Sequence, residues 1–506
     1  MNLQTRTHNS IRNIIFGLAN QVIVLLLNFV SRTVFIRVLG AEYLGINGLF
    51  LNIVTVLSLM DLGIGNAMVY SFYKPIAKND HDKIAALISF YKKMYNLIAL
   101  LVLIIGIMII PILNLIVKTD NDIPLLKLYY ILFLFNTVLS YLFVYKSSII
   151  TADQKQYLVN MYSSVFTAIK TIAQLLVLLI TGNYILYLVI NFMFTFINNI
   201  AIAVKADKMY PFIRKKSNLE KFEKISILNN IKSMFLYKIC GVLLNGTDNI
   251  IISMLVGTIW VGYYSNYSML ITAVSNFITI VFTSMYASIG NMVQKSDEKR
   301  KYEIFNIILM IGFWITIIST SCFSTLINDF IELWAGREYV FDNHIVIAII
   351  INFYLFCVLN PIWSFRDATG LFKKTKYIML FTAVINIVLS IILGKIFGVF
   401  GVLISTAISR LVTYFWYEPV VLYKDFFGKS SKEYFGKQIL FAIVTITSVI
   451  ICLGCGSILK DVTWINLIIK TVLCFIVSNL CFIVINMKTD EFKYIFKKLL
   501  TYISKS

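Results

Sequence analysis

Long apolar runs recur along the whole sequence and decide what it can fold into. Fourteen segments of 18 or more mostly apolar residues are separated by short polar stretches, and hydrophobic residues make up 59% of the chain. A helix of that length crosses the roughly 30 Å hydrocarbon core of a bilayer. Because the runs are continuous rather than alternating, they indicate helices and not a barrel. We therefore predict an all-α, polytopic membrane protein with 14 transmembrane helices. The predicted segments are 13–38, 44–71, 86–113, 124–149, 158–181, 184–206, 231–256, 261–290, 304–328, 343–365, 376–396, 399–423, 438–459 and 463–487.

The basic residues fall mostly on one side of these segments. Alternate loops, the segment ends that adjoin them and the two termini hold 34 of the 45 Lys and Arg residues, the opposite side holds 6 counted in the same way, and 5 lie deeper within segments. Positive charge collects on the cytoplasmic side of membrane proteins, so both termini are expected in the cytoplasm. The net charge of +20 then reflects topology and contact with anionic membrane lipids, and we expect no nucleic-acid partner.

The chain repeats itself faintly. At an offset of 217 residues, similar residues coincide in order: Asn28 with Asn245, Gly40 with Gly257, and Gly45 with Gly262. At an offset of 220, Lys146 meets Arg366. Each copy spans six predicted helices, so we expect two pseudo-symmetric six-helix lobes followed by two further helices. The expected organisation is an N-lobe at 1–206, a cytoplasmic linker at 207–230, a C-lobe at 231–428, helices 13 and 14 at 429–487, and a cytoplasmic amphipathic tail at 488–506.

Several charged side chains lie well inside the apolar segments. They are Arg32, Asp61, Lys170, Lys238, Asp248 and Arg410. A charge at membrane depth costs about 2.5–3.5 kcal/mol, so it normally faces a watery cavity or a partner. Four of the six are basic and two are acidic, and this balance predicts an interior that favours an anion.

Neutral polar residues share helix faces with these charges. Asn28 lies one turn before Arg32, and Gln174 lies one turn after Lys170. We predict that one group of residues binds the substrate: Arg32, Lys170, Lys238, Arg410, Asn28, Asn245 and Gln174. Asp61 and Asp248 are predicted either to bind a coupling H⁺ or Na⁺ or to pair with these cations.

Other roles stay open for the same cations. Arg32 and Lys238 lie about two turns from a segment end and could extend to the membrane surface. Lys170 and Arg410 lie near mid-segment, where a buried ion pair is the main alternative. Lys470, near the outer face, is expected to snorkel on the lipid side. No catalytic triad or metal cluster can be assembled from the sequence, so neither a catalytic nor a metal site is predicted.

A cavity of this composition suits an amphiphilic anion. A phosphate or pyrophosphate cannot enter hydrocarbon without losing its hydration. Guanidinium and ammonium groups would replace that hydration with charge-assisted hydrogen bonds, and neutral polar side chains could meet sugar hydroxyls. A lipid tail would remain in hydrocarbon, through a gap between the lobes.

Four short motifs resemble those of polysaccharide repeat-unit flippases for O-antigen and capsule. They are residues 39–45 (LGAEYLG), 61–65 (DLGIG), 333–339 (LWAGREY) and 398–402 (GVFGV). The resemblance implies the multidrug/oligosaccharidyl-lipid/polysaccharide exporter superfamily, with a two-lobed fold like that of multidrug and toxin extrusion (MATE) proteins. It also implies that the protein flips an undecaprenyl-pyrophosphate-linked oligosaccharide across the bacterial cytoplasmic membrane by alternating access, for capsule, O-antigen or exopolysaccharide synthesis.

The same resemblance implies no enzyme activity and no cofactor, with transport coupled to a Na⁺ or H⁺ gradient. Membrane lipids and a polysaccharide polymerase are the further expected partners, and a monomer is expected. Two other transporters stay open: a lipid-linked peptidoglycan-precursor flippase, whose cargo is also a pyrophosphate lipid, and a MATE-type drug antiporter, which a basic interior disfavours. A membrane glycan polymerase or ligase is a weaker alternative, because the longest outer loop, about residues 329–342, is short.

Overall fold

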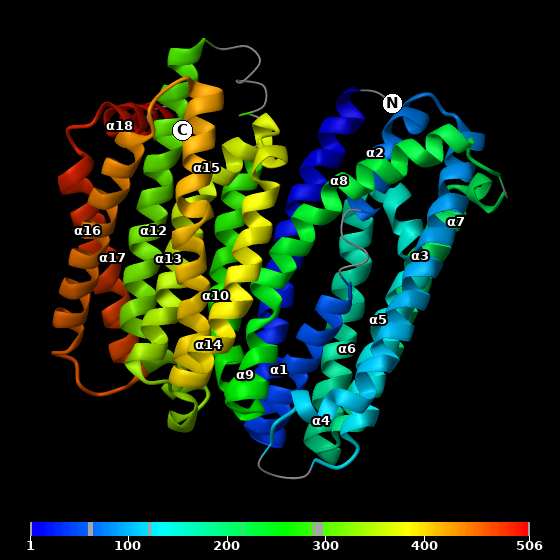
Figure 1. Ribbon diagram of the computed structural model, residues 1–506, viewed down its shortest axis with the longest axis horizontal. Helices are drawn as coiled ribbons and strands as arrows, with labels where there is room; N and C mark the ends of the chain where they lie inside the picture. Colours follow the sequence, from blue (N-terminus) through cyan, green and yellow to red (C-terminus); the bar gives the residue numbers. More distant parts are fainter. Residues whose placement is uncertain are drawn as a thin grey trace. The chain divides into compact units, whose positions relative to one another are not determined.

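Every regular element among the described residues of the computed structural model is helical (Figure 1). The structure describes residues 3–58, 64–119, 123–215, 217–285, 289 and 297–503. The chain divides into two compact units, unit 1 at Met1–Gly262 and unit 2 at Tyr263–Ser506. The lobe boundaries expected from the sequence stay a prediction.

Unit 1 is a bundle in which α5 packs on α3 and α7, and α6 packs on α1 and α7. Its helices are α1 (Leu3–Leu57), α2 (Ile64–Ala77), α3 (His81–Ile109), α4 (Leu113–Ile116), α5 (Leu126–Ala152), α6 (Gln156–Thr181), α7 (Tyr184–Met209), α8 (Lys221–Gly246), α9 (Asp248–Leu255) and the start of α10 (Thr258–Ser284). Local chemistry sets the α6–α7 turn. Gly182 takes φ 61° after α6, and the Asn183 side chain then accepts hydrogen bonds from the first amides of α7.

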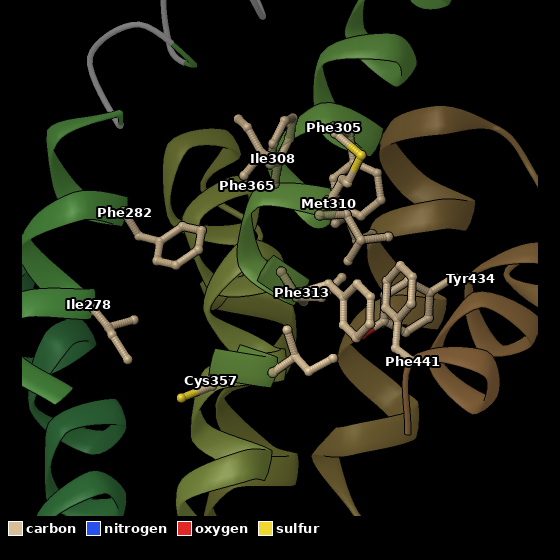
Figure 2. Close-up of a cluster of buried hydrophobic side chains, with 14 of the residues drawn as sticks. Ile278, Phe282, Phe305, Ile308, Met310, Phe313, Cys357, Phe365, Tyr434 and Phe441 are labelled. Atoms are coloured by element: carbon tan, nitrogen blue, oxygen red, sulfur yellow. The ribbon is translucent and has the colours of Figure 1, made fainter. Parts of the chain in front are cut away.

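Unit 2 is built around α12, which packs on α13, α16 and α17. Its helices after α10 are α12 (Glu298–Trp334), α13 (Asn343–Thr369), α14 (Phe372–Val412), α15 (Tyr414–Leu422), α16 (Lys432–Gly456), α17 (Trp464–Asn486) and α18 (Asp490–Ile503). Aromatic side chains fill the core of this unit (Figure 2). Phe313 of α12 stacks on Phe441 of α16 with ring centroids 3.9 Å apart, and Phe492 of the tail helix α18 contacts Phe482 of α17.

Eleven helices among the described residues are long and apolar enough to cross a membrane. The chain is therefore an all-α polytopic membrane protein, while the sequence predicted 14 crossings. Two of the expected loops are bends within longer helices. Gly40 has φ 80° inside α1, and Gly398 has φ 59° inside α14. Glycine adopts these angles without a Cβ clash, which allows the chain to change direction there. The predicted segment 231–256 is divided between α8 and α9.

Two glycines that the faint repeat aligns pack against each other's motif within unit 1. A Cβ on Gly45 would overlap the Thr258 carbonyl, and a Cβ on Gly262 would overlap the Ala41 carbonyl. The offset of 217 converts Gly45 into Gly262 and Ala41 into Thr258. The two contacts are therefore equivalent, as two copies of one motif related by a local two-fold axis would give.

Candidate functional site

Two predicted site residues of α6 meet the same stretch of α7 in unit 1. The Lys170 ammonium donates a hydrogen bond to Asn191 Oδ1 at 3.1 Å. One turn further along α6, Gln174 donates to the backbone carbonyl of Tyr187 at 3.1 Å and is 4% exposed. Among the described residues, no carboxylate lies within 4.0 Å of Lys170. The positive charge of Lys170 is thus held by a neutral amide.

Arg32 approaches the same part of α7 from α1. It lies within electrostatic range of the Tyr187 hydroxyl, which also bonds to the neighbouring Ser31. Phe35, one turn on, packs edge-on against Tyr187 at 5.3 Å. The structure therefore brings Arg32, Lys170 and Gln174 to one region, which we call the α7 polar cluster. Asn28, one turn before Arg32, is exposed.

Arg410 belongs to unit 2 and joins a polar column between α13 and α15. Its Nη1 donates to the Asn352 carbonyl at 3.3 Å, and its side chain also bonds to the Tyr414 hydroxyl. Arg410 is 9% exposed and Tyr414 2%. The Tyr414 hydroxyl is also within electrostatic range of Glu418, one turn further along α15. The polar contacts therefore continue from Arg410 at the end of α14 into α15.

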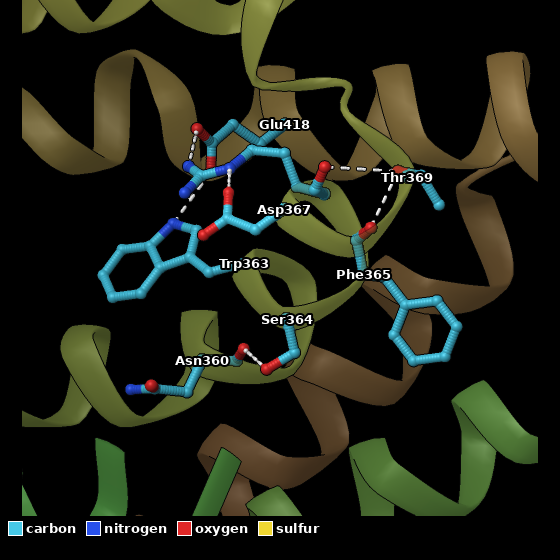
Figure 3. Close-up of polar contacts among 8 residues, drawn as sticks. Asn360, Trp363, Ser364, Phe365, Asp367, Thr369 and Glu418 are labelled. Carbon is cyan, nitrogen blue, oxygen red and sulfur yellow. Dashed lines mark hydrogen bonds and ion pairs between the residues drawn. The ribbon is translucent and has the colours of Figure 1, made fainter. Parts of the chain in front are cut away.

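A buried ion pair that the sequence did not reveal completes this column (Figure 3). Arg366 of α13 donates through Nη1 to Glu418 Oε1 at 2.6 Å, and through Nε to Asp367 at 2.8 Å. The Trp363 indole donates to the other oxygen of Glu418 at 2.8 Å. Arg366 lies one residue beyond the predicted segment 343–365, in an expected loop. The signal that could have found the pair is Glu418, a lone acid inside the predicted segment 399–423.

Unit 1 contains a similar pair. The Lys146 ammonium, at the end of α5, lies 2.7 Å from Asp207 Oδ2 near the end of α7. The two side chains are 20% and 14% exposed. Lys146 is the residue that the offset of 220 aligns with Arg366. Each unit therefore joins two of its helices by an ion pair whose cations, but not whose carboxylates, are aligned by that offset.

The remaining predicted residues fall elsewhere. Asp248 is 8% exposed in the first turn of α9, where the positive end of the helix dipole favours a carboxylate. Asp61 lies outside the described residues, as do the side chains of Lys238 and Asn245. Two groups of candidate residues are thus described, each within its own unit: Arg32, Lys170 and Gln174 in unit 1, and Arg410 with its neighbours in unit 2.

The prediction for Lys470 was wrong. Its ammonium does not extend to the membrane surface but lies 2.7 Å from Asp329 Oδ2 of α12. The two side chains are 9% and 22% exposed. A pair across two packed helices satisfies the charge locally, so Lys470 has no need to snorkel.

Unit 2 also has an apolar groove of about 420 Å³ between α13 and α16. Its walls are mainly aliphatic and include Ile347, Ile350, Ile446 and Ile450. Three of these side chains are more than half exposed, at 54%, 59% and 63% for Ile347, Ile446 and Ile450. A groove of this chemistry accepts a hydrocarbon chain.

These contacts supply charge and hydrogen bonds inside apolar helices. A held ammonium or guanidinium group attracts phosphate oxygens, and amides and hydroxyls can bond to sugars. In the described part of the chain, no group of three or more His, Cys, Asp or Glu side chains is arranged to hold a metal ion.

The fold is that of known membrane transporters. A structure of the lipid II flippase MurJ in an inward closed conformation matches with a TM-score of 0.66 at 16% identity, covering 94% of this chain and 99% of that one. An inward-facing multidrug resistance MATE family transporter of the MOP superfamily matches with a TM-score of 0.58 at 12% identity, over 79% and 94% of the two chains. A MOP superfamily transporter from Pyrococcus furiosus, described as having a binding pocket of reverse polarity, matches at 0.51 and 13% identity, over 80% and 94%.

Comparison of sequences gives the family. No curated protein matches the chain. Residues 10–290, more than half of the chain, match the polysaccharide biosynthesis protein family. The order of motifs in the sequence, the all-helical MOP-type fold and this match agree with one another. The chain belongs to the polysaccharide biosynthesis protein family, and its fold is a transporter fold rather than that of an enzyme.

Proposed function

We propose that this protein is a flippase that moves an undecaprenyl-pyrophosphate-linked oligosaccharide repeat unit from the cytoplasmic to the outer leaflet. It does so by alternating access, for capsule, O-antigen or exopolysaccharide synthesis. Membership of the polysaccharide biosynthesis family implies a lipid-linked glycan as the substrate. The further detail rests on the chemistry of the α7 polar cluster.

The observation that carries the proposal is the neutral partner of Lys170. A buried ammonium in a transmembrane helix is normally paired with a carboxylate, as Lys470 is with Asp329. Lys170 is held by the Asn191 amide instead, so its charge is available to a passing anion. Arg32 adds a second cation close by. Two cations with amide and hydroxyl neighbours are suited to a pyrophosphate that carries sugars.

The remaining features fit the same cargo. The aliphatic groove between α13 and α16 suits a polyisoprenoid tail. We infer 14 crossings, and both termini in the cytoplasm of a bacterium. The bends at Gly40 and Gly398 separate two of the eleven candidate spans and give thirteen, and the predicted segment 231–256, divided between α8 and α9, is the fourteenth. Asp61 and Asp248 are the proposed H⁺ or Na⁺ sites, a polysaccharide polymerase is the proposed partner, and the protein acts as a monomer.

The test is complementation of a bacterial strain that lacks its repeat-unit flippase, read as surface polysaccharide per unit of membrane-inserted protein. Lys170→Gln keeps the hydrogen bond and removes the charge. Loss of one charge-assisted contact should reduce surface glycan by at least about tenfold. Lys170→Arg should retain most activity. Lys395→Gln removes an exposed charge from α14 and serves as the matched control. Full activity of Lys170→Gln at a normal protein level would refute the proposal.

The likeness to a lipid II flippase supplies a second candidate cargo. A lipid-linked peptidoglycan precursor offers the same pyrophosphate to Lys170 and Arg32. The two candidates separate in one experiment, because a strain depleted of its own lipid II flippase should be rescued only by a protein that carries that lipid. Rescue of growth there, without rescue of surface polysaccharide in the first strain, would favour the second candidate.

A further inference from the structure

A small pocket in unit 1 lies apart from the α7 polar cluster. It has a volume of about 290 Å³ and lies between the first half of α3 and the chain segment that leads into α8. Its polar lining comes from both sides. Ser89 and Lys93 belong to α3, and Ser217, Asn218 and Lys224 belong to the segment and the first turn of α8. The pocket therefore offers two ammonium groups with hydroxyl and amide donors.

Two nearby lysines have acidic partners, whereas the two pocket lysines have none among the described residues. Lys83 pairs with Glu223, and Lys215 lies 3.5 Å from Asp82. Within the described part of the chain, neither Lys93 nor Lys224 lies within 4.0 Å of a carboxylate. The nearby acid Glu223 is already engaged by Lys83. The net charge of the lining residues is thus positive and open to an anion from outside the protein.

The other wall of the pocket continues into the lipid-facing surface of α3. Phe90, Met94 and Leu97 line the pocket, and Leu97 is also 58% exposed. The same helix face carries further exposed apolar side chains at helical spacing: Leu101, Ile104 and Met108, which are 38%, 47% and 69% exposed. Across the pocket, Phe222 of α8 is 80% exposed. An occupant with an anionic head and long apolar chains would match both parts.

We propose that this pocket binds one anionic glycerophospholipid, with its phosphate between Lys93 and Lys224 and its acyl chains along α3. Charge complementarity selects the headgroup, and the continuous apolar face selects a lipid over free phosphate. The predicted topology places this end of α3 at the cytoplasmic leaflet, where anionic lipids are concentrated. The site is separate from the proposed transport function and does not depend on it.

The experiment is native mass spectrometry of the full chain in detergent, titrated with phosphatidylglycerol and, separately, phosphatidylcholine. The wild type should bind phosphatidylglycerol more tightly than phosphatidylcholine. The double variant Lys93→Gln/Lys224→Gln should bind it about 10- to 30-fold more weakly. The charge-matched control Lys92→Gln/Lys221→Gln removes two exposed lysines from the same elements that do not line the pocket, and should change binding less than about threefold.

The charge-retaining variant Lys93→Arg/Lys224→Arg keeps the proposal testable if the glutamine variant loses stability, because it should bind phosphatidylglycerol like the wild type. Equal weakening in the pocket variant and the charge-matched control would overturn the proposal in favour of diffuse surface charge. Displacement of phosphatidylglycerol by undecaprenyl phosphate at a lower concentration would also overturn it, since the pocket would then serve the transported lipid.

Discussion

The buried pair between Arg366 and Glu418 makes a sharp prediction about stability. The Glu418 side chain is 0% exposed and that of Arg366 is 6%. In Arg366→Ala the Trp363 indole would still donate to Glu418, but the guanidinium that balances its charge would be gone. Removing one partner of a buried ion pair costs about 3–5 kcal/mol, because the other charge stays in a medium that does not solvate it.

The reverse substitution should cost less. In Glu418→Ala, Arg366 keeps Asp367, whose carboxylate lies 2.8 Å from Nε and is 35% exposed. The double variant Arg366→Met/Glu418→Leu removes both charges and fills the space with apolar atoms. Its main remaining cost is the unsatisfied Trp363 N–H, about 1–3 kcal/mol. The double variant should therefore be more stable than Arg366→Ala alone, which a sum of independent losses cannot give.

The assay is thermal unfolding of the purified chain in detergent. A loss of about 3–5 kcal/mol corresponds to a fall of roughly 6–20 °C in melting temperature for a unit of this size. Lys374→Ala is the matched control, because it breaks the pair of Lys374 with Asp425, which are 60% and 26% exposed. An exposed pair contributes only about 0–1 kcal/mol. Equal melting temperatures for Arg366→Ala and Lys374→Ala would refute the reasoning. A double variant less stable than Arg366→Ala would refute it as well.

Three further outcomes are expected. Gly45→Ala should lower stability by about 1–3 kcal/mol, because the new Cβ would meet a backbone carbonyl. Gly436→Ala has open space around the new Cβ and should raise stability by up to about 1 kcal/mol. Thermal unfolding of the two variants measures the difference. Lys470→Ala should lower the melting temperature but leave transport per folded molecule unchanged, as measured by complementation against protein level. In a cysteine-free background, a cysteine replacing Lys460 should react with an impermeant maleimide in intact cells and one replacing Asn79 should not; the opposite pattern would invert the topology.

Much of the fold follows from the apolar runs, and the differences have a local cause. Continuous apolar stretches of helical length specify helices whatever their partners are, so most predicted segments recur as helices. The bends at Gly40 and Gly398 read as loops in the sequence, because a glycine flanked by polar or aromatic residues interrupts the apolar pattern. A positive φ redirects a helix without requiring several unpaired residues.

The proximity of two candidate residues was predictable where both lie on one helix. Lys170 and Gln174 were identified because they share a face of α6, and both meet α7. Pairing across helices is different, since it depends on which helices become neighbours. Lys470 and Asp329 are 141 positions apart, and Arg366 and Glu418 are 52 apart. Periodicity along a single segment contains no information about such partners.

Each unit contains an ion pair between two of its helices. Lys146 pairs with Asp207 in unit 1, and Arg366 pairs with Glu418 in unit 2. In both pairs the cation comes first in the sequence, and one long helix, α6 or α14, separates it from the helix that holds the carboxylate. The residue types differ, with Lys and Asp in one pair and Arg and Glu in the other, so a comparison of the two sequence halves gives only a weak match. Only the cations follow the offset of 220, so the duplication stays a prediction.

One corresponding contact differs in charge, and the difference bears on function. Lys170 of α6 bonds to Asn191 of α7 across the turn at Gly182. At offsets of 216 and 215, Asn386 bonds to Thr406 at 2.9 Å across the bend in α14. The second copy makes the bridge with two neutral side chains, so packing alone does not require an ammonium in the first. A charge that packing does not require, and that costs about 2.5–3.5 kcal/mol to insert, fits the proposed role of Lys170 in binding an anion. Lys170→Gln should therefore leave the free energy of unfolding within about 1 kcal/mol of the wild-type value while transport falls. A loss of stability that accounts for the loss of transport would assign Lys170 to the fold.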